Sequence, residues 1–89
     1  MESTTTRRFR DALGALPVDI QDRAREAYKL FCDDHNHPSL RFKKVHQTLP
    51  IYSARITRDY RAVGVVDGNL VVWFWIGSHK DYEKVLASL

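Results

Sequence analysis

One histidine, two arginines and a tyrosine in the second half of the chain are residue types that can carry out phosphodiester cleavage. Arg55 and Arg61 stand on neighbouring strand-like segments, and His79 follows the next apolar segment, shortly before Tyr82. An imidazole that titrates near neutral pH can transfer protons. Guanidinium groups can stabilise the negative charge that builds on a phosphate in the transition state. Together these groups could protonate the leaving 5′-oxygen of an RNA and neutralise the phosphorane without a metal ion.

Positive charge is concentrated in the middle of the chain. The whole sequence has 14 Lys and Arg against 11 Asp and Glu, which gives a formal net charge of +3. The basic residues between positions 41 and 61 are Arg41, Lys43, Lys44, Arg55, Arg58 and Arg61, against the one acid Asp59. Such a block is the electrostatic pattern of a surface that binds a polyanion. The alternative is a solvated sheet surface kept soluble by its charges, with His79 capping a helix.

The segment from Leu70 to Ile76 is the element that must position these groups. It is apolar throughout, and turn signals flank it at Asp67-Gly68 and Gly77-Ser78. Because both alternating faces are apolar, the segment predicts an inner strand that is covered from both sides. Alternation also places Trp73 and Trp75 on one face, where we expect core packing rather than stacking on bases.

The remaining segments predict further helices and strands around this central strand. Helical spacing of apolar residues predicts helices over 7–16, from Val18 or Asp19 to about Phe31, and over 80–89. The other strands are expected over 40–45, 52–57 and 60–66. Thr4, Thr5 or Thr6 can cap the first helix. We therefore predict one α+β domain over residues 1–89, with two N-terminal helices, a four-stranded antiparallel sheet and a short C-terminal helix, the helices lying on one face.

The sequence favours neither a metal site nor a membrane segment. Cys32 is the one cysteine, which excludes an internal disulfide and a cysteine-based zinc site. His35 and His37 lie beside two aspartates, but a metal would need further converging ligands, so we expect a polar loop and no cofactor. The N-terminal segment lacks the apolar core of a signal peptide, and no stretch approaches membrane-spanning length. These features predict a cytoplasmic protein with no membrane partner.

Three short pieces of the chain carry a resemblance to a known family. They are YSARI at Tyr52–Ile56, YRAV at Tyr60–Val63, and GSH at Gly77–His79 after the apolar strand. In this order and spacing, the chain resembles the RelE/ParE superfamily of toxins from bacterial type II toxin–antitoxin systems, over most of its length. The resemblance implies the α+β fold of that superfamily. RelE-like members are ribosome-dependent mRNA endoribonucleases (mRNA interferases) that cut in the ribosomal A site by metal-independent 2′-hydroxyl attack, which inhibits translation.

The resemblance also implies roles for the candidate catalytic residues. Arg61 matches the strand arginine that contacts the scissile phosphate, and His79 matches the C-terminal histidine that several members use as general acid or base. Arg55 matches a basic strand position. Tyr82 lies near the end where some members place a catalytic tyrosine, although not always at this spacing.

A second group of residues is expected to bind RNA rather than to react with it. Where some relatives carry a catalytic carboxylate, this chain has Phe42 and Lys43, so the resemblance leaves the general base open. His46 is a candidate for this second proton-transfer role. The expected RNA-binding residues are Arg41, Lys43, Lys44, His46 and Arg58.

The resemblance implies a cognate antitoxin that folds on binding and holds the toxin inactive, and it is compatible with higher-order toxin–antitoxin assemblies. Two alternatives stay open. One is a ParE-like inhibitor of DNA gyrase, which needs no catalytic histidine. The other is a non-catalytic RNA- or protein-binding module, because a fold does not fix a function.

Overall fold

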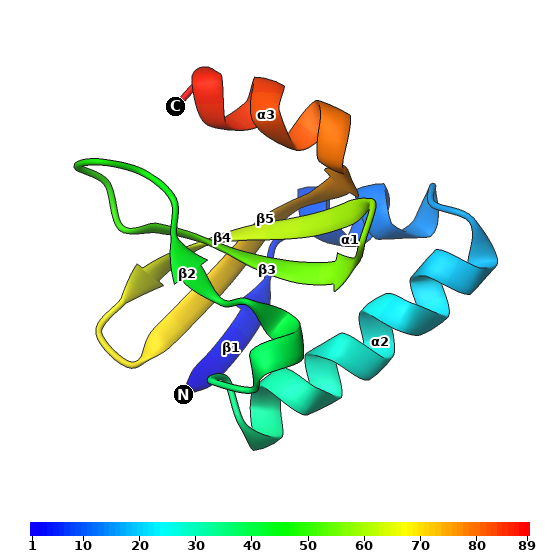
Figure 1. Cartoon of the computed structure of the whole chain (residues 1–89), viewed down its shortest axis with the longest axis horizontal. Helices are drawn as coiled ribbons and strands as arrows, with labels where there is room; N and C mark the ends of the chain where they lie inside the picture. Colours follow the sequence, from blue (N-terminus) through cyan, green and yellow to red (C-terminus); the bar gives the residue numbers. More distant parts are fainter.

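The computed structural model describes residues 1–89 as a mixed five-stranded sheet with helices on both faces (Figure 1). The strands are β1 (Glu2–Thr5), β2 (Lys43–Lys44), β3 (Ile51–Thr57), β4 (Tyr60–Asp67) and β5 (Leu70–Ser78). The helices are α1 (Arg7–Gly14), α2 (Val18–Asp33), α3 (His79–Ala87) and the short 3₁₀ helix η1 (Pro38–Leu40). The strand order is β1-β5-β4-β3-β2, so β5, β4 and β3 are inner strands. The α+β class is as predicted.

The sheet differs from the predicted four antiparallel strands because it has an additional strand, β1. This strand pairs in parallel with β5, beginning at Glu2 opposite Leu70, whereas the other neighbouring strands are antiparallel. Its sequence, ESTT, has no apolar alternation, and it can be polar because it lies at the edge of the sheet. The predicted threonine cap is confirmed at Thr6, whose Oγ1 accepts a hydrogen bond from the Phe9 N–H at 3.1 Å.

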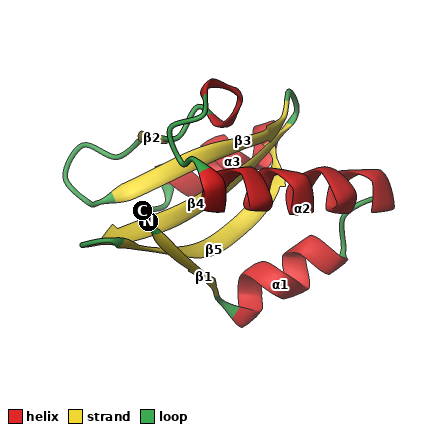
Figure 2. Ribbon diagram, turned by 90° about the horizontal axis from the view of Figure 1, so that it is seen from below, coloured by secondary structure: helices red, strands yellow, loops and turns green.

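The helices cover both faces of the sheet, so the prediction of helices on one face is wrong. α1 and α2 pack on the first face, where Phe9 and Phe31 join Trp73 of β5 in the larger apolar core. α3 packs on the second face, where its Tyr82 joins Val63 of β4 in a smaller core. Figure 2 shows α2 in front of the strands, α1 below them and α3 behind them. A strand that is apolar on both faces needs this second cover, because apolar surface is stabilised by removal from water.

A β-bulge in β5 decides which tryptophan faces which helix layer. Val63 of β4 pairs with Trp75 and Gly64 pairs with Trp73, so Phe74 is the additional residue on the bulged strand. Trp73 therefore lies in the α1/α2 core at 3% exposure, while Trp75 packs against the core under α3. The prediction that the two side chains share a face is wrong, because it assumed an uninterrupted alternation. The prediction that both pack internally is confirmed.

Two glycines make room for these indole rings. A Cβ at Gly64 would lie 2.9 Å from the Trp73 ring, and a Cβ at Gly77 would lie 2.6 Å from the Trp75 ring. Neither distance is tolerable for a methyl group against an aromatic ring in a packed layer. The bulge and these glycines therefore act together, and Gly77 does so directly opposite Arg61.

The predicted strand over 40–45 shortens to β2, which pairs with β3 only at Ser53 and Tyr52. Pro38 begins η1, and Arg41 ends it in the left-handed conformation with φ 45°. This turn interrupts the extended chain before it can lengthen the ladder. As a result, the outer edge of β3 from Ala54 to Thr57 has no strand beside it.

Candidate active site

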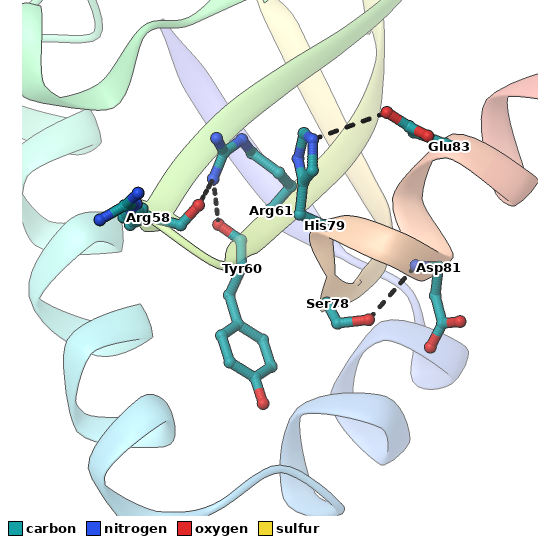
Figure 3. Close-up of polar contacts among 7 residues, drawn as sticks. All are labelled: Arg58, Tyr60, Arg61, Ser78, His79, Asp81 and Glu83. Carbon is teal, nitrogen blue, oxygen red and sulfur yellow. Dashed lines mark hydrogen bonds and ion pairs between the residues drawn. The ribbon is translucent and has the colours of Figure 1, made fainter.

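Arg61 is held against the turn between β3 and β4 by main-chain carbonyl groups. Its Nη1 donates to the carbonyl oxygens of Thr57 at 2.7 Å, Tyr60 at 3.0 Å and Arg58 at 3.1 Å. Figure 3 draws the contacts with Arg58 and Tyr60. No other hydrogen bond or ion pair engages the guanidinium, so Nε and Nη2 remain available to an anion. The turn therefore orients Arg61 while leaving donors for a ligand.

Arg55 stands directly opposite Arg61 in the ladder between β3 and β4. Neither guanidinium has a carboxylate within ion-pair distance. Partial burial lowers the pKa of Arg61, the positive charges of Arg55 and Arg41 lower it further, and Tyr82 acts in the opposite direction. Two uncompensated cations that share one end of a sheet are stabilised by a bound anion, and guanidinium groups match phosphate oxygens in geometry.

His79 is the first residue of α3 and follows β5 directly. Its N–H donates to the Asp59 carbonyl at 2.7 Å, which ties the start of the helix to the β3–β4 turn. Its Nε2 lies 3.7 Å from Glu83 Oε1, and about half of its side chain is exposed (Figure 3). Ser78, not His79, caps the helix, because its Oγ accepts from the Asp81 N–H at 3.2 Å. His79 is thus placed at the end of the strand paired with that of Arg61, as predicted.

Tyr82 joins the histidine to the arginines. Its ring is stacked with that of His79, with centroids 5.6 Å apart, and is tilted against Trp75 at 6.5 Å. The residue is 9% exposed, so packing fixes the ring. Its phenol is close enough to Arg61 to raise the pKa of that guanidinium. The four candidate catalytic residues from the sequence, His79, Tyr82, Arg55 and Arg61, therefore gather at one end of the second sheet face.

Comparison with known proteins identifies the family to which the chain belongs. A family model described as the ParE-like toxin domain matches residues 18–84, which include all four of these residues. The chain belongs to the ParE-like toxin family. A search of curated protein sequences finds no match to this ParE-like toxin. The resemblance to the RelE/ParE superfamily seen in the sequence is thereby confirmed.

Solved toxin structures share the fold of this ParE-like toxin at low sequence identity. A chain of the RelB–RelE antitoxin–toxin complex from Methanococcus jannaschii is 19% identical, with 91% of this chain and 95% of that chain covered and a TM-score of 0.69. YoeB from Staphylococcus aureus, solved as a dimer, is 18% identical, with 89% and 97% covered and a TM-score of 0.67. A YafQ variant from E. coli is 6% identical, with 91% and 96% covered and a TM-score of 0.72. These likenesses establish the fold.

Four of the five predicted RNA-binding residues of the ParE-like toxin are exposed on β2, on the residue that ends η1 and on the β3–β4 turn. Lys43 and Lys44 are exposed on β2, next to β3, and Arg58 is exposed in the β3–β4 turn. Arg41 is exposed as well, and its positive charge contributes to lowering the pKa of Arg61. These cations extend the positive surface without entering the group around His79.

His46 is not brought to the candidate catalytic group. Its Nδ1 accepts hydrogen bonds from the N–H groups of Thr48 at 3.2 Å and Leu49 at 3.0 Å. Its Nε2 lies 3.4 Å from the carbonyl oxygen of Leu89, beyond the C-terminal end of α3, whereas His79 begins that helix. His46 therefore organises the loop between β2 and β3, and it is far from the position that a second proton-transfer group would need.

Glu83 is a residue that sequence reasoning missed. It lies one helical turn after His79 and supplies the one carboxylate in ion-pair range of that imidazole. The spacing of four residues within the predicted terminal helix was the signal that could have found it. The His79 side chain is half exposed and that of Glu83 is largely exposed, so the pair by itself adds little stability.

The remaining polar loop residues of this ParE-like toxin pack locally. The His35 ring lies 6.0 Å from Phe31 and 6.2 Å from Phe42, while His37 Nδ1 lies 2.8 Å from Ser39 Oγ. No group of three or more His, Cys, Asp or Glu is arranged to hold a metal ion. None of the helices combines the length and apolar character needed to cross a membrane.

A mainly apolar cavity lies on the opposite face from the candidate site. Its volume is about 510 Å³, and it is lined by apolar residues of α1, α2 and the first sheet face, including Phe9, Phe31 and Trp73. None of the candidate catalytic or RNA-binding residues lines it. The candidate site is instead an open surface, as expected for a chain of this size.

Proposed function

We propose that this ParE-like toxin is a ribosome-dependent endoribonuclease that cuts mRNA in the ribosomal A site by attack of the 2′-hydroxyl on the adjacent phosphate. The observation that carries the proposal is the pair formed by Arg55 and Arg61, two adjacent guanidinium groups without a carboxylate partner. His79 and Tyr82 beside them supply titratable groups, and the fold that the chain shares with RelE, YoeB and YafQ structures supports the same chemistry.

In the proposed reaction, the free nitrogens of Arg61 bind the non-bridging oxygens of the scissile phosphate, and Arg55 adds a second positive charge. The 2′-oxygen forms a bond to phosphorus and the bond from phosphorus to the 5′-oxygen breaks. Protonated His79 gives its proton to the leaving 5′-oxygen, which is worth about 10²–10⁴-fold in rate. The products are a 2′,3′-cyclic phosphate and a 5′-hydroxyl. Arginine donors aimed at the phosphorane supply roughly a further 10²–10³-fold each.

The proton of the 2′-hydroxyl needs an acceptor, and the chain offers two groups near His79. The first is the Tyr82 phenol, which is fixed by stacking and lies within electrostatic reach of Arg61. The second is the Glu83 carboxylate, at 3.7 Å from the imidazole. A carboxylate can accept a proton directly, whereas a phenol must first lose its own, so we assign Glu83 as the base that accepts this proton or relays it through water.

We further propose that a cognate antitoxin holds the protein inactive by covering the second sheet face or by displacing α3. α3 rests on a smaller core, around Tyr82, than the one under α1 and α2, so we expect it to be the more easily displaced. The antitoxin–toxin complex from Methanococcus jannaschii, which has the same fold, supports a partner of this kind. Toxin and antitoxin would form larger assemblies, and a ribosomal target puts the activity in the cytoplasm.

The test of the proposed reaction uses the purified protein with ribosomes programmed with a defined mRNA. Cleavage in the A-site codon should leave a 2′,3′-cyclic phosphate on one fragment and a 5′-hydroxyl on the other. The matched control is the same mRNA with a 2′-deoxynucleotide at the cleavage position, which should stay intact because the nucleophile is missing. Cleavage of the deoxy-substituted mRNA, or fragments with 5′-phosphates, would exclude 2′-hydroxyl attack.

A second candidate function is inhibition of DNA gyrase, which the description of the matching family model as ParE-like favours. This activity requires no proton transfer, so replacing His79 should leave it unchanged. Plasmid supercoiling by gyrase in the presence of wild-type protein and of His79→Ala separates the two candidates. Equal inhibition by both proteins, without any mRNA cleavage, would favour gyrase as the target.

A further inference from the structure

A second hollow lies beside the arginine pair, along the open edge of β3. α2 and η1 flank this edge, and the space between them and β3 is a cleft of about 340 Å³. Volumes of this size are typical of sites that hold a small molecule or one unit of a polymer. The polar residues that line the cleft are Arg23, Glu26, Ser39, Arg55 and Thr57.

Two of these residues also belong to the candidate active site. Arg55 lines the cleft and stands opposite Arg61 in the ladder. Thr57 lines the cleft, and its carbonyl oxygen accepts a hydrogen bond from Arg61 Nη1 at 2.7 Å. The cleft therefore begins where the arginine pair ends, and a chain bound at Arg61 can continue directly into it.

The chemistry of the cleft suits a phosphate. Arg23 supplies a guanidinium that makes no ion pair, and Arg55 supplies a second one. The unpaired edge of β3 adds main-chain groups that have no neighbouring strand to bond with. Glu26 is the one acidic residue in the lining, and it opposes an anion there.

We propose that this cleft binds the phosphate of the nucleotide next to the scissile one in single-stranded RNA, with Arg23 as its main cation. The inference rests on the proposed endoribonuclease function and extends it, because it gives the RNA a direction across the surface, from Arg61 over the edge of β3 to α2. Arg23 contacts the flanking phosphate and takes no part in the reaction.

The test measures binding of a fluorescein-labelled RNA hexamer, 2′-O-methylated to prevent cleavage, by fluorescence anisotropy. Arg23→Gln should weaken binding about tenfold, the loss expected for one charge-assisted phosphate contact. It should also reduce the slope of log K against log salt by about 0.7. Glu26→Gln should have the opposite effect and tighten RNA binding roughly threefold, because it removes the one negative charge in the cleft lining that repels the phosphate.

The matched controls are Arg25→Gln and Asp22→Asn, on the same helix. These exposed residues pair with each other at 3.6 Å and do not line the cleft. Each variant changes the net charge as the corresponding cleft variant does, so both should bind the hexamer within about twofold of wild type. Equal effects of Arg23→Gln and Arg25→Gln would overturn the proposal, because binding would then follow net charge alone.

A probe with one phosphate tests the position of the contact. A 2′-O-methylated dinucleoside monophosphate should compete for wild type and Arg23→Gln equally, because its phosphate sits at Arg61. A trinucleotide with two phosphates should compete less well for Arg23→Gln. If Arg23→Gln instead weakens only the binding of an octaglutamate peptide and leaves RNA unaffected, the cleft serves a protein partner and the proposal fails.

The outcomes separate this inference from the function on which it rests. If wild type binds the hexamer and Arg61→Gln does not, while Arg23→Gln binds like wild type, only the cleft assignment is wrong. If the folded wild-type protein binds no RNA, on or off the ribosome, both proposals are wrong.

Discussion

At the scale of single residues, Arg55 and Arg61 are placed at the cost of some stability. Two cations face each other across neighbouring strands, and burial together with the charge of Arg55 lowers the pKa of Arg61. For a base whose charged form is the protonated one, a lowered pKa means that folding disfavours the charge. Burial and like charge therefore disfavour the two cations in the free protein, and a bound anion would offset this repulsion, as expected at an anion-binding site.

Arg55→Gln should therefore stabilise the free protein while weakening its RNA cleavage. We expect the free energy of unfolding to rise by roughly 0.5 kcal/mol, a small value because the guanidinium groups are partly solvated. Urea unfolding at low salt measures this change, which should shrink in 1 M NaCl as the repulsion is screened. Arg58→Gln is the matched control, since it removes the same charge from the exposed turn. A destabilised Arg55→Gln protein would show that the pair is not repulsive.

At the scale of elements, α3 carries His79 and Tyr82 and depends on its cap. Ser78 Oγ accepts from the Asp81 N–H at 3.2 Å, just as Thr6 Oγ1 accepts from Phe9 at the start of α1 on the opposite face. Ser78→Ala and Thr6→Ala should each lower the free energy of unfolding by about 1 kcal/mol.

Ser78→Ala, but not Thr6→Ala, should lose activity in the cleavage assay, by roughly five- to tenfold, because α3 and not α1 positions the His79 imidazole. Thermal unfolding and cleavage, measured on both proteins well below their melting temperatures, check this difference. Equal activities would mean that the position of His79 does not depend on the helix cap.

Gly77 and the bulge at Phe74 form a second element on which the site depends. A Cβ at residue 77 would lie 2.6 Å from the Trp75 ring, which in turn packs against Tyr82. Gly77→Ala should lower the free energy of unfolding by about 1–3 kcal/mol and change the fluorescence of Trp75. Gly14→Ala is the control, because a Cβ there meets nothing within 4 Å in α1 and should be neutral or mildly stabilising. An unchanged Gly77→Ala protein would contradict the packing described.

The elements with strong periodicity were predictable from the sequence, and those decided by pairing were not. β5 and α2 are visible as an apolar run and an amphipathic stripe, and Asp67-Gly68 marks the hairpin that joins β4 to β5. β1 carries no pattern, because a polar edge strand is specified by its partner and not by its own residues. The bulge at Phe74 could not be predicted either, since one inserted residue in β5 moves the side chains on one side of it to the other sheet face.

In the candidate site, features set by the pairing of β4 with β5 were predictable and those set by loops and packing were not. The proximity of His79 to Arg61 was predictable because a strand end and a neighbouring strand bring them together in any antiparallel arrangement of β4 and β5. His46 was misplaced as a partner, because its position depends on a loop that it closes itself through Thr48 and Leu49. The cleft at Arg23 could not be foreseen, since it arises from the packing of α2 against a strand edge.

At the scale of the whole molecule, the two sheet faces have different roles. The first face is an apolar core under α1 and α2, and the second presents cations around a smaller core under α3. RNA affinity should therefore be strongly salt-dependent, with a slope of log K against log salt of about −0.7 for each phosphate neutralised. Arg61 and Arg55 contact the scissile phosphate and Arg23 the flanking one, so for two phosphates we expect a slope of about −1.4 in anisotropy titrations from 50 to 300 mM salt. A slope near zero would contradict binding through the phosphates.

The central claim is that His79, beside the arginine pair, transfers a proton during cleavage of ribosome-bound mRNA. Its most direct test compares wild type, His79→Ala and the loop variant His37→Ala on ribosomes programmed with one mRNA, with cleavage mapped by primer extension. We expect A-site cuts by wild type and His37→Ala at equal rates, and a rate lower by about 10²–10⁴-fold for His79→Ala. Equal cleavage by His79→Ala, or no cleavage by folded wild type, would contradict it.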